Sequence, residues 1–236
     1  MTALIGLATR LGLARLMLIT GARTEKDDLT GFIDAAFAGG VDLVQLRDPE
    51  ADEDALLVAL KVMRDIGFHY QGLISVYESG SLAEKFKADL LHLSERGEKP
   101  AAARKHVHEW ALIGQSCHST GQIDAALADP DVNYLTVGPV YGGMPVGASG
   151  LDLVRHAATV APPGAVDSKP WFAVGGITGA TLEEVLDAGA RRIAVSRAIT
   201  DAENAEAAAL TLKDRLRQIW NDDPAMQSLI LKLFQA

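Results

Sequence analysis

The chain is poor in cysteine and in positive charge. Cys117 is the one cysteine among 236 residues, which excludes an internal disulfide and is typical of a reducing compartment. Lys and Arg number 22 against 31 Asp and Glu, and the net charge of −9 argues against nonspecific nucleic-acid binding. No hydrophobic run approaches the length of a membrane span, and the N-terminus lacks the charged-then-apolar order of a signal peptide. We therefore predict a cytoplasmic protein with no nucleic-acid or membrane partner.

Short hydrophobic runs alternate with amphipathic segments along the chain. Eight runs are typical of strands buried on both faces: residues 15–20, 41–47, 72–77, 89–94, 111–118, 133–138, 170–176 and 191–197. Helical patterns lie between them, and several end in glycine just before the next strand. Eight β/α units in roughly 200 residues predict a (β/α)8 TIM barrel of the α/β class, with a doubly wound sheet as the alternative.

No linker, low-complexity stretch or break in composition divides the chain. We therefore predict a single domain over residues 1–236, with the barrel at about residues 15–218. Residues 221–236 form an extension with a small apolar helical pattern. We expect this extension to cover the outside of the barrel, and a contact within a homodimer is the alternative.

The glycine pair after the seventh strand is the clearest indication of a ligand-binding site in the sequence. In such barrels the active site lies at the C-terminal ends of the strands. Gly175 and Gly176 stand at such an end, just before a helix whose start is expected near Thr178 or Thr181. Adjacent glycines expose backbone N–H groups, and a helix start adds partial positive charge. Together with VSRAI after the eighth strand, this pattern predicts a phosphate site, and a strand-end turn without a ligand is the alternative.

Other strand ends carry polar candidates. Gln45 and Arg47 share one face of the second strand, because side chains alternate along a strand, and they suit an anionic ligand. His118 is either a proton carrier or a hydrogen-bonded structural histidine. Glu78 and Glu95 are strand-end carboxylates that can share a magnesium ion. Cys117 has no neighbouring cation to activate a thiolate, so we do not expect a nucleophile there.

Six motifs follow one another in the order found in one known family: VQLRD, ADLLHL, IGQSCH, YLTVGPVY, WFAVGGI and DAGARRIAVSRAI. On these motifs the chain resembles the thiamin phosphate synthase and TenI family of (β/α)8 barrels, over about residues 15–218. The synthase of that family joins hydroxymethylpyrimidine pyrophosphate to a thiazole phosphate. Pyrophosphate departs first with the help of magnesium, and the thiazole nitrogen captures the resulting cation.

The resemblance implies roles for the matching residues. Gln45 and Arg47 would contact the pyrophosphate of the pyrimidine substrate, and Ser116 and Gly138 are further substrate-binding candidates. The thiazole phosphate would be cradled by Gly175, Gly176, Val195 and Ser196. Glu78 is the candidate magnesium ligand if the chain is a synthase.

Four positions depart from the synthase pattern. Pro49 stands where the synthase usually has lysine, and Tyr77-Glu78 stands in for Asn-Asp. An aspartate expected near Gly97 is absent, although glutamates lie close by. The segment between Gly138 and Gly150 contains no charged side chain, whereas the synthase carries a threonine-rich loop with a lysine there. Cationic donors lower the barrier to pyrophosphate departure. These changes therefore leave fewer cationic groups to stabilise the departing pyrophosphate.

The departures lead to three hypotheses. We favour a TenI-like thiazole tautomerase, in which His118 of the Ser-x-His motif is the general base and Arg47 and Gln45 grip the substrate carboxylate. The alternative is a thiamin phosphate synthase that uses magnesium. A further alternative is a non-catalytic regulator that binds a phosphate ligand. In each case the expected partner is a small molecule, a thiazole phosphate.

Overall fold

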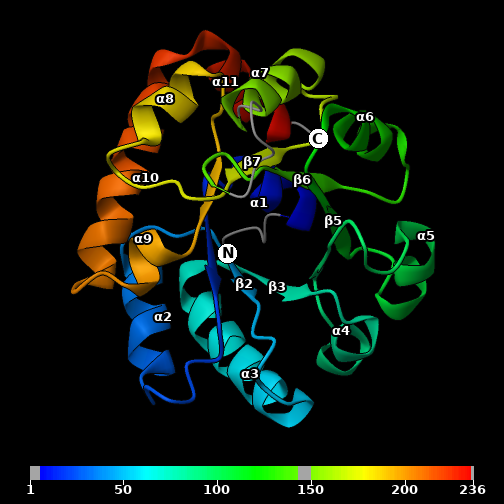
Figure 1. The fold of residues 1–236 in the computed structure, drawn as a ribbon, viewed down its shortest axis with the longest axis vertical. Helices are drawn as coiled ribbons and strands as arrows, with labels where there is room; N and C mark the ends of the chain where they lie inside the picture. The colour runs from blue at the N-terminus through cyan, green and yellow to red at the C-terminus, as the bar shows by residue number, and fades with distance from the viewer. Residues whose placement is uncertain (1–5, 143–149, 235–236) are drawn as a thin grey trace.

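The computed structural model describes residues 6–142 and 150–234. Eight parallel strands close into a barrel in chain order (Figure 1). The strands are β1 (Leu16–Thr20), β2 (Leu43–Leu46), β3 (Leu73–Tyr77), β4 (Leu90–Leu93), β5 (Leu112–Cys117), β6 (Tyr134–Val137), β7 (Trp171–Val174) and β8 (Ile193–Val195). The predicted (β/α)8 barrel is confirmed, and each strand lies inside its predicted range.

Helices follow the strands and surround them as an outer ring (Figure 1). They are α2 (Leu29–Ala38), α3 (Glu53–Tyr70), α4 (Gly80–Phe86), α5 (Pro100–Ala103), α6 (Thr120–Ala128), α7 (Gly150–Val160), α8 (Leu182–Asp187) and α10 (Ala205–Asp222). Two of the connections differ from the sequence pattern. The helix after β4 is one turn, continued by a 3-10 turn at Arg104–His106, and an extra turn, α9 (Arg197–Thr200), stands directly after β8. None of the described helices is long and apolar enough to cross a membrane.

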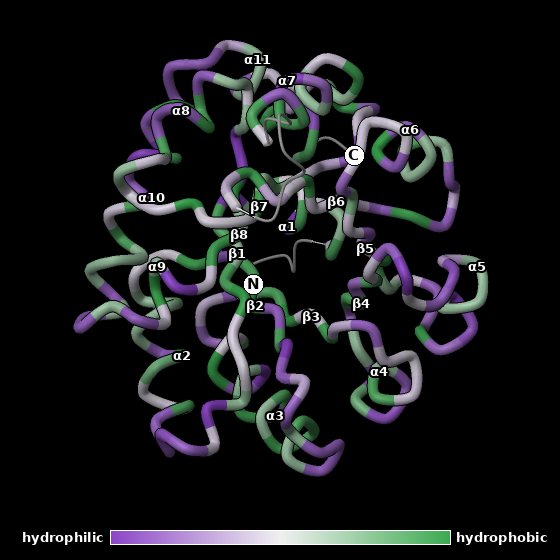
Figure 2. Tube along the Cα trace, in the orientation of Figure 1, coloured by the Kyte–Doolittle hydropathy of each residue, from purple (hydrophilic) through white to green (hydrophobic). Residues whose placement is uncertain are grey.

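Hydrophobic side chains pack on both faces of the strands. One layer lies between the strands and the helices, and Figure 2 shows hydrophobic residues along the strands and hydrophilic residues on many outer turns. The second layer fills the barrel interior: Met17, Leu43, Leu73, Leu90, Leu112, Tyr134, Phe172 and Ala194. Packing on both faces explains why the strands read as unbroken hydrophobic runs.

A short helix that the sequence analysis did not predict closes the N-terminal end of the barrel. Leu11 and Ala14, in and just after α1 (Leu7–Leu13), belong to the interior layer, and Figure 1 shows α1 behind the ring of strands. Arg10 donates hydrogen bonds to the carbonyls of Gln71 and Gly72. Seven residues are too few for a helix to be stable alone, so α1 depends on these tertiary contacts. With that end closed, the opposite end forms the open mouth.

The C-terminal extension is helix α11 (Pro224–Leu233). Asp223 caps it by accepting a hydrogen bond from the N–H of Ala225. Met226 and Leu229 are buried with Trp220 of α10, and Leu233 packs against Gly12 of α1. The extension therefore holds α10 and α1 together at the closed end of the barrel, away from the mouth.

Candidate active site

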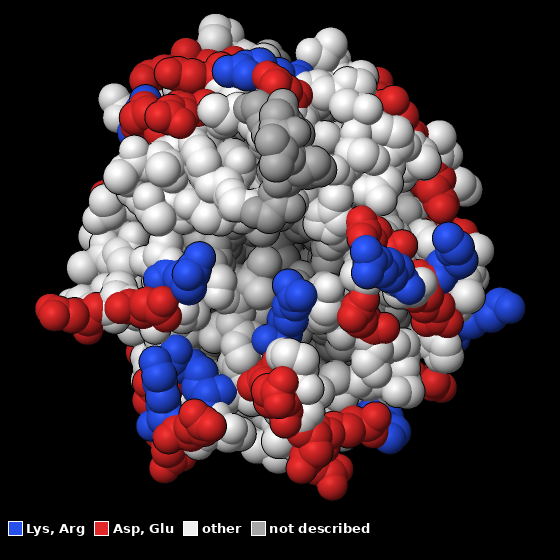
Figure 3. All heavy atoms as spheres, in the orientation of Figure 1, with Lys and Arg blue, Asp and Glu red and all other residues white. Residues whose placement is uncertain are grey.

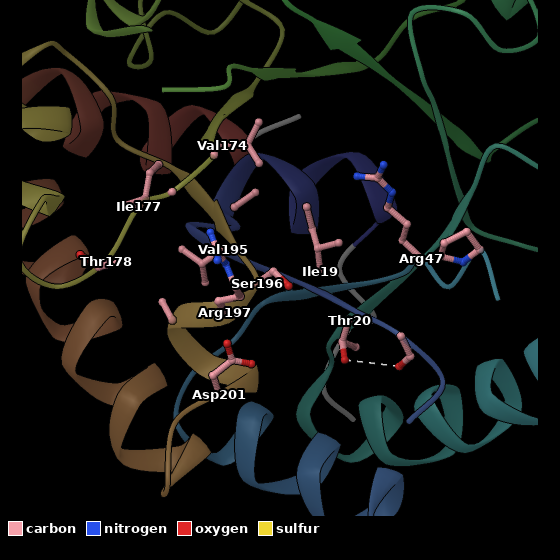
Figure 4. Close-up of a pocket in the computed structure, with 16 residues that line it drawn as sticks. Ile19, Thr20, Arg47, Val174, Ile177, Thr178, Val195, Ser196, Arg197 and Asp201 are labelled. Carbon is pink, nitrogen blue, oxygen red and sulfur yellow. Dashed lines mark hydrogen bonds between the residues drawn. The ribbon is translucent and has the colours of Figure 1, made fainter. Parts of the chain in front are cut away.

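A cavity of about 680 Å³ opens at the C-terminal ends of β1, β2, β7 and β8. Figure 3 shows this face of the molecule hollowed at its centre, with lysine and arginine side chains near the hollow. The cavity is lined by Ile19, Thr20, Gly21, Arg47, Pro49, Val174, Gly175, Gly176, Ile177, Thr178, Ala194, Val195, Ser196, Arg197, Ala198 and Asp201 (Figure 4). All four residues predicted to cradle a phosphate are in this lining, together with Arg47.

The turn after β7 has a backbone that only glycine adopts easily. Gly175 has φ +107° and Gly176 has φ +67°. A Cβ at Gly175 would lie 2.7 Å from the Cα of Pro139, and a Cβ at Gly176 would lie 2.8 Å from the Cβ of Tyr141. The N–H of Tyr141 donates to the carbonyl of Gly175 at 2.9 Å, which fixes the turn against the segment after β6. The turn thus presents bare backbone to the cavity, as a phosphate site requires.

The end of β8 supplies the adjoining wall. Val195 is the last, buried residue of the strand, and Ser196 is exposed. The carbonyl of Ser196 accepts the N–H groups of Ile199 and Thr200 at 2.9 and 3.0 Å, so α9 starts at the cavity. The first amides of a helix have no acceptor within the helix and are available to a ligand. The two strand ends therefore form one continuous wall of backbone.

Arg47 lies across the cavity from that wall. Its backbone N–H donates to the carbonyl of Thr20 at 2.9 Å, which ties the end of β2 to β1. Its Cζ atom lies 4.7 Å from the centre of the Tyr77 ring, within the range of a cation–π contact. Burial raises the pKa of the Tyr77 hydroxyl, so the ring stays neutral beside the guanidinium. Figure 4 shows Arg47 far from Ile177 and Thr178 on the cavity's edge.

A layer of neutral polar side chains lies inside the barrel. His92 Nε2 lies 3.0 Å from the Oγ of Ser116 and 3.2 Å from the Oγ1 of Thr136. Burial lowers the pKa of His92 to about 3, so its ring is uncharged at neutral pH. Gln45 is 2% exposed, and neither its Oε1 nor the Nδ1 of His92 has a hydrogen-bond partner among the described residues. Unpaired buried polar atoms are costly, and a ligand that bonds to them removes that cost.

Gln45 lies within β2 and Arg47 directly follows its last residue, and the two residues differ in burial. Arg47 is exposed and lines the cavity, whereas Gln45 is buried and is absent from the lining. Ser116 contacts His92, a residue of β4 that was not among the site candidates from the sequence.

His118 lies outside the lining of the cavity. Its Nδ1 is 2.5 Å from the carbonyl oxygen of Gly138, and its Nε2 is 3.7 Å from the Oε2 of Glu95. Its backbone N–H donates to the side chain of Gln122. A ring held between a carbonyl and a carboxylate can be structural or can exchange a proton with a carboxylate. Both readings of His118 from the sequence therefore stand.

Cys117, next to it in the sequence, is fully buried, and burial raises the pKa of its thiol to about 12. A thiol of this kind is not a nucleophile, which agrees with the sequence analysis.

The two candidate magnesium ligands are each engaged elsewhere. Glu78 has φ +59° and accepts a hydrogen bond from the hydroxyl of Ser94. Glu95 accepts one from Gln122 and lies 3.2 Å from the Nε of Arg96. Within residues 6–142 and 150–234, no group of three His, Cys, Asp or Glu side chains converges as a metal site would require. The side chains do not form a preassembled site for the magnesium ion that the resemblance implies.

Several lining residues were not selected from the sequence. Thr20 ends the first strand and Gly21 follows it, and this strand end carries no charge and gave no signal. Arg197 begins the short helix α9, which the sequence pattern did not reveal, and Asp201 follows the last residue of that helix. Their position at or shortly after a strand end was the signal that could have identified them, since strand ends build the mouth of the barrel.

Comparison with known proteins identifies the family. Residues 16–199 match the family model described as thiamine monophosphate synthase. A thiamine-phosphate synthase of Thermobifida fusca is 43% identical over 215 residues, covering 89% of this chain and 95% of the relative. A thiamine-phosphate synthase of Mycobacterium marinum is 43% identical over 222 residues, covering 88% of this chain and 97% of the relative.

A solved structure agrees at the level of the fold. The thiamine phosphate pyrophosphorylase from Pyrococcus furiosus has a TM-score of 0.75 at 24% identity, and the alignment covers 91% of this chain and 99% of that one. The names of these relatives support the synthase alternative and give no support to the tautomerase that the sequence analysis favoured. The chain belongs to the thiamine monophosphate synthase family.

Proposed function

We propose that the chain is a thiamin phosphate synthase, a transferase that joins hydroxymethylpyrimidine pyrophosphate to thiazole phosphate and releases pyrophosphate. The observation that carries the proposal is the cavity, in which a wall of glycine backbone faces an arginine. Such a cavity suits a reaction between two anionic substrates. The names of relatives that align over almost the whole of both chains add support.

Each wall would have its own task in this reaction. The backbone of Gly175, Gly176 and Ser196 would hold the phosphate of the thiazole. Arg47 would meet the pyrophosphate of the pyrimidine substrate. When the carbon–oxygen bond breaks, its electron pair leaves on the pyrophosphate, and the guanidinium stabilises the charge that develops there. The thiazole nitrogen then donates its lone pair to the pyrimidine methylene carbon and forms the new carbon–nitrogen bond.

The uncharged layer inside the barrel suits the heteroaromatic part of a substrate. Gln45 and His92 each present a buried polar atom without a protein partner, and an aminopyrimidine ring has both donors and acceptors to offer them. Because burial keeps the His92 ring neutral, the barrel interior places no positive charge beside the cation formed in the reaction.

Two cationic donors of the family pattern are missing, so we expect slow turnover. Pro49 lines the cavity where the family has a lysine, and no lysine occurs between Gly138 and Gly150. A single donor aimed at developing charge typically accounts for a factor of about 10²–10³ in kcat. The loss of one or two such donors lowers the rate without removing either substrate from its wall.

The test is a coupling assay with the purified chain, both substrates and magnesium in the buffer, in which thiamin phosphate is measured by chromatography. We expect product that requires both substrates and that falls sharply in an Arg47→Met variant. The control is Arg155→Gln, since Arg155 lies on the outer helix α7 and pairs with Asp152. An absence of product while thiazole phosphate still binds would overturn the proposal. Isomerisation of a thiazole carboxylate phosphate that His118→Gln abolishes would then identify the tautomerase, and binding alone would identify the regulator.

A further inference from the structure

We propose that Arg197 is the cation of the phosphate wall, and that its guanidinium binds the thiazole phosphate held by the glycine turn. The inference rests on the proposed function and adds to it a specificity-determining residue. In this site Arg47 and Arg197 divide the two anionic substrates between them.

The position of Arg197 supports this role. It is the first residue of α9, directly after Ser196, and it lines the same cavity as Gly175 and Gly176. Figure 4 shows its guanidinium nitrogens beside Val195, on the wall of the cavity. The side chain is thus next to the backbone groups proposed to hold the phosphate.

The topology of the barrel separates the two arginines. Strand β1 pairs with β8 on one side and with β2 on the other. Neighbouring strands lie about 4.8 Å apart, so the ends of β8 and β2 are roughly 10 Å apart. Arg197 and Arg47 therefore approach the cavity from two sides, with the end of β1 as its floor. This spacing leaves room for each arginine to meet a different anion.

Arg197 also has a free charge. Many arginines of the chain have a carboxylate within 4.0 Å, including Arg23, Arg191 and Arg215. In the part of the chain that the structure describes, Arg197 has no such carboxylate and no side-chain hydrogen bond. Asp201 lines the same cavity, but its Oδ1 accepts from the hydroxyl of Thr200 at 3.0 Å. An unpaired guanidinium beside exposed amides is suited to a phosphate.

The lack of charge in the β6–α7 connection makes the positive charge of Arg197 important for binding the phosphate. No Lys, Arg, His, Asp or Glu occurs between Gly138 and Gly150, so that connection contributes no charge to the ligand. Asp201 adds a negative charge on the cavity wall, which opposes the binding of an anion. Without Arg197 the phosphate wall would carry a net repulsive charge.

The experiment compares the binding of thiazole phosphate with that of the dephosphorylated thiazole alcohol by calorimetry. For Arg197→Met we expect the Kd of the phosphate to rise by about 10- to 100-fold, the loss of one charge-assisted contact of about 1.5–3 kcal/mol. The alcohol should bind as it does to the wild type. Arg197→Lys should recover part of the affinity, and Arg155→Gln should match the wild type.

A second substitution adds a readout specific to charge. In Arg197→Met, the change Asp201→Asn should restore part of the phosphate affinity, because it removes the opposing carboxylate. In steady-state assays of the coupling reaction, Arg197→Met should raise the KM of thiazole phosphate and leave the KM of the pyrimidine pyrophosphate unchanged. A rise confined to the KM of the pyrophosphate would overturn the assignment.

The failures of the two proposals differ. An unchanged Kd for thiazole phosphate in Arg197→Met refutes the inference, whether or not the wild type makes product. Binding that depends on Arg197 in a wild-type chain that makes no product refutes the coupling reaction and leaves the inference in place. A wild-type chain that does not bind thiazole phosphate refutes both. Arg197 is exposed, so the variants should fold, and circular dichroism checks that they do.

Discussion

The two sides of the barrel mouth are built from different materials. The β7–β8 side presents mostly backbone, with two glycines at positive φ and a serine at the start of α9, beside the side chain of Arg197. The β2–β5 side presents side chains, among them Arg47 against Tyr77 and His118 beside Glu95. The backbone side keeps the motifs of the family, whereas Pro49, Tyr77 and Glu78, which depart from the synthase pattern, lie at or after the ends of β2 and β3. Anion binding by backbone depends on the path of the chain, whereas charge stabilisation during a reaction depends on individual side chains.

Removal of Arg47 should give the largest difference between the two sides, since it should affect the reaction rate and not the binding of thiazole phosphate. In Arg47→Met we expect kcat of the coupling reaction to fall by about 10²–10³-fold, because the remaining guanidinium near the leaving group is lost. The Kd of thiazole phosphate should stay within about twofold of the wild type. Steady-state kinetics together with calorimetry measure both quantities. Equal losses of kcat and of thiazole phosphate affinity would mean that the two sides are one site.

Substitution of Gly175 should have the opposite effect and weaken the binding of thiazole phosphate. In Gly175→Ala the methyl group meets Pro139 and the residue must keep a positive φ, so we expect a loss of about 1–2 kcal/mol in stability. Thiazole phosphate binding should weaken by at least about tenfold, since one lost hydrogen bond to a charged group costs about 1.5–3 kcal/mol. The matched control is Gly179→Ala, where an added Cβ meets no described atom within 4 Å. Unaltered binding in a folded Gly175→Ala variant would show that the turn does not hold the phosphate.

The neutral histidine inside the barrel should make the fold sensitive to acid. The pKa of His92 is about 3 in the folded chain and about 6.5 in the unfolded chain. Between these values only the unfolded chain takes up the proton. The contribution of His92 to stability is therefore lost as the pH falls from about 6.5 toward 3, by up to about 1.4 kcal/mol per pH unit, and His92 causes no loss above that window.

Urea unfolding at pH 7, 6 and 5 measures this slope, with His92→Gln as the comparison. The variant lacks the titrating ring, so its stability should fall less steeply with pH than that of the wild type. Equal slopes would show that His92 is not held neutral by burial.

The smallest expected effect concerns the ring beneath Arg47. In Tyr77→Leu the guanidinium loses a cation–π contact of about 0.5–1 kcal/mol, so we expect kcat to fall by about two- to fivefold. Tyr77→Phe keeps the ring and should retain nearly full activity. Stopped-flow or steady-state rates of pyrophosphate release distinguish the pair. A larger loss in the phenylalanine variant than in the leucine variant would assign the role to the hydroxyl instead.

The sequence predicted the barrel because each strand is buried on both faces and reads as a hydrophobic run. It did not predict α1 or α9, since helices of seven and four residues are stabilised by tertiary contacts and leave little pattern. The glycine turn was predictable because its residues adjoin in the chain. The contact of Arg47 with Tyr77 and that of His92 with Ser116 join different strands, and such pairs meet only once the barrel closes. Glu78 accepts a hydrogen bond from Ser94 and has a positive φ, and this backbone conformation could not be predicted from the sequence.

The sharpest comparison of the two sides is a full kinetic analysis of both substrates with the wild type, Arg47→Met and Arg197→Met in parallel. We predict that Arg47→Met lowers kcat and keeps the KM of thiazole phosphate, whereas Arg197→Met raises that KM and keeps kcat largely intact. If both variants alter the same parameter of the same substrate, the two arginines grip one anion and the division of the mouth into two sides is wrong.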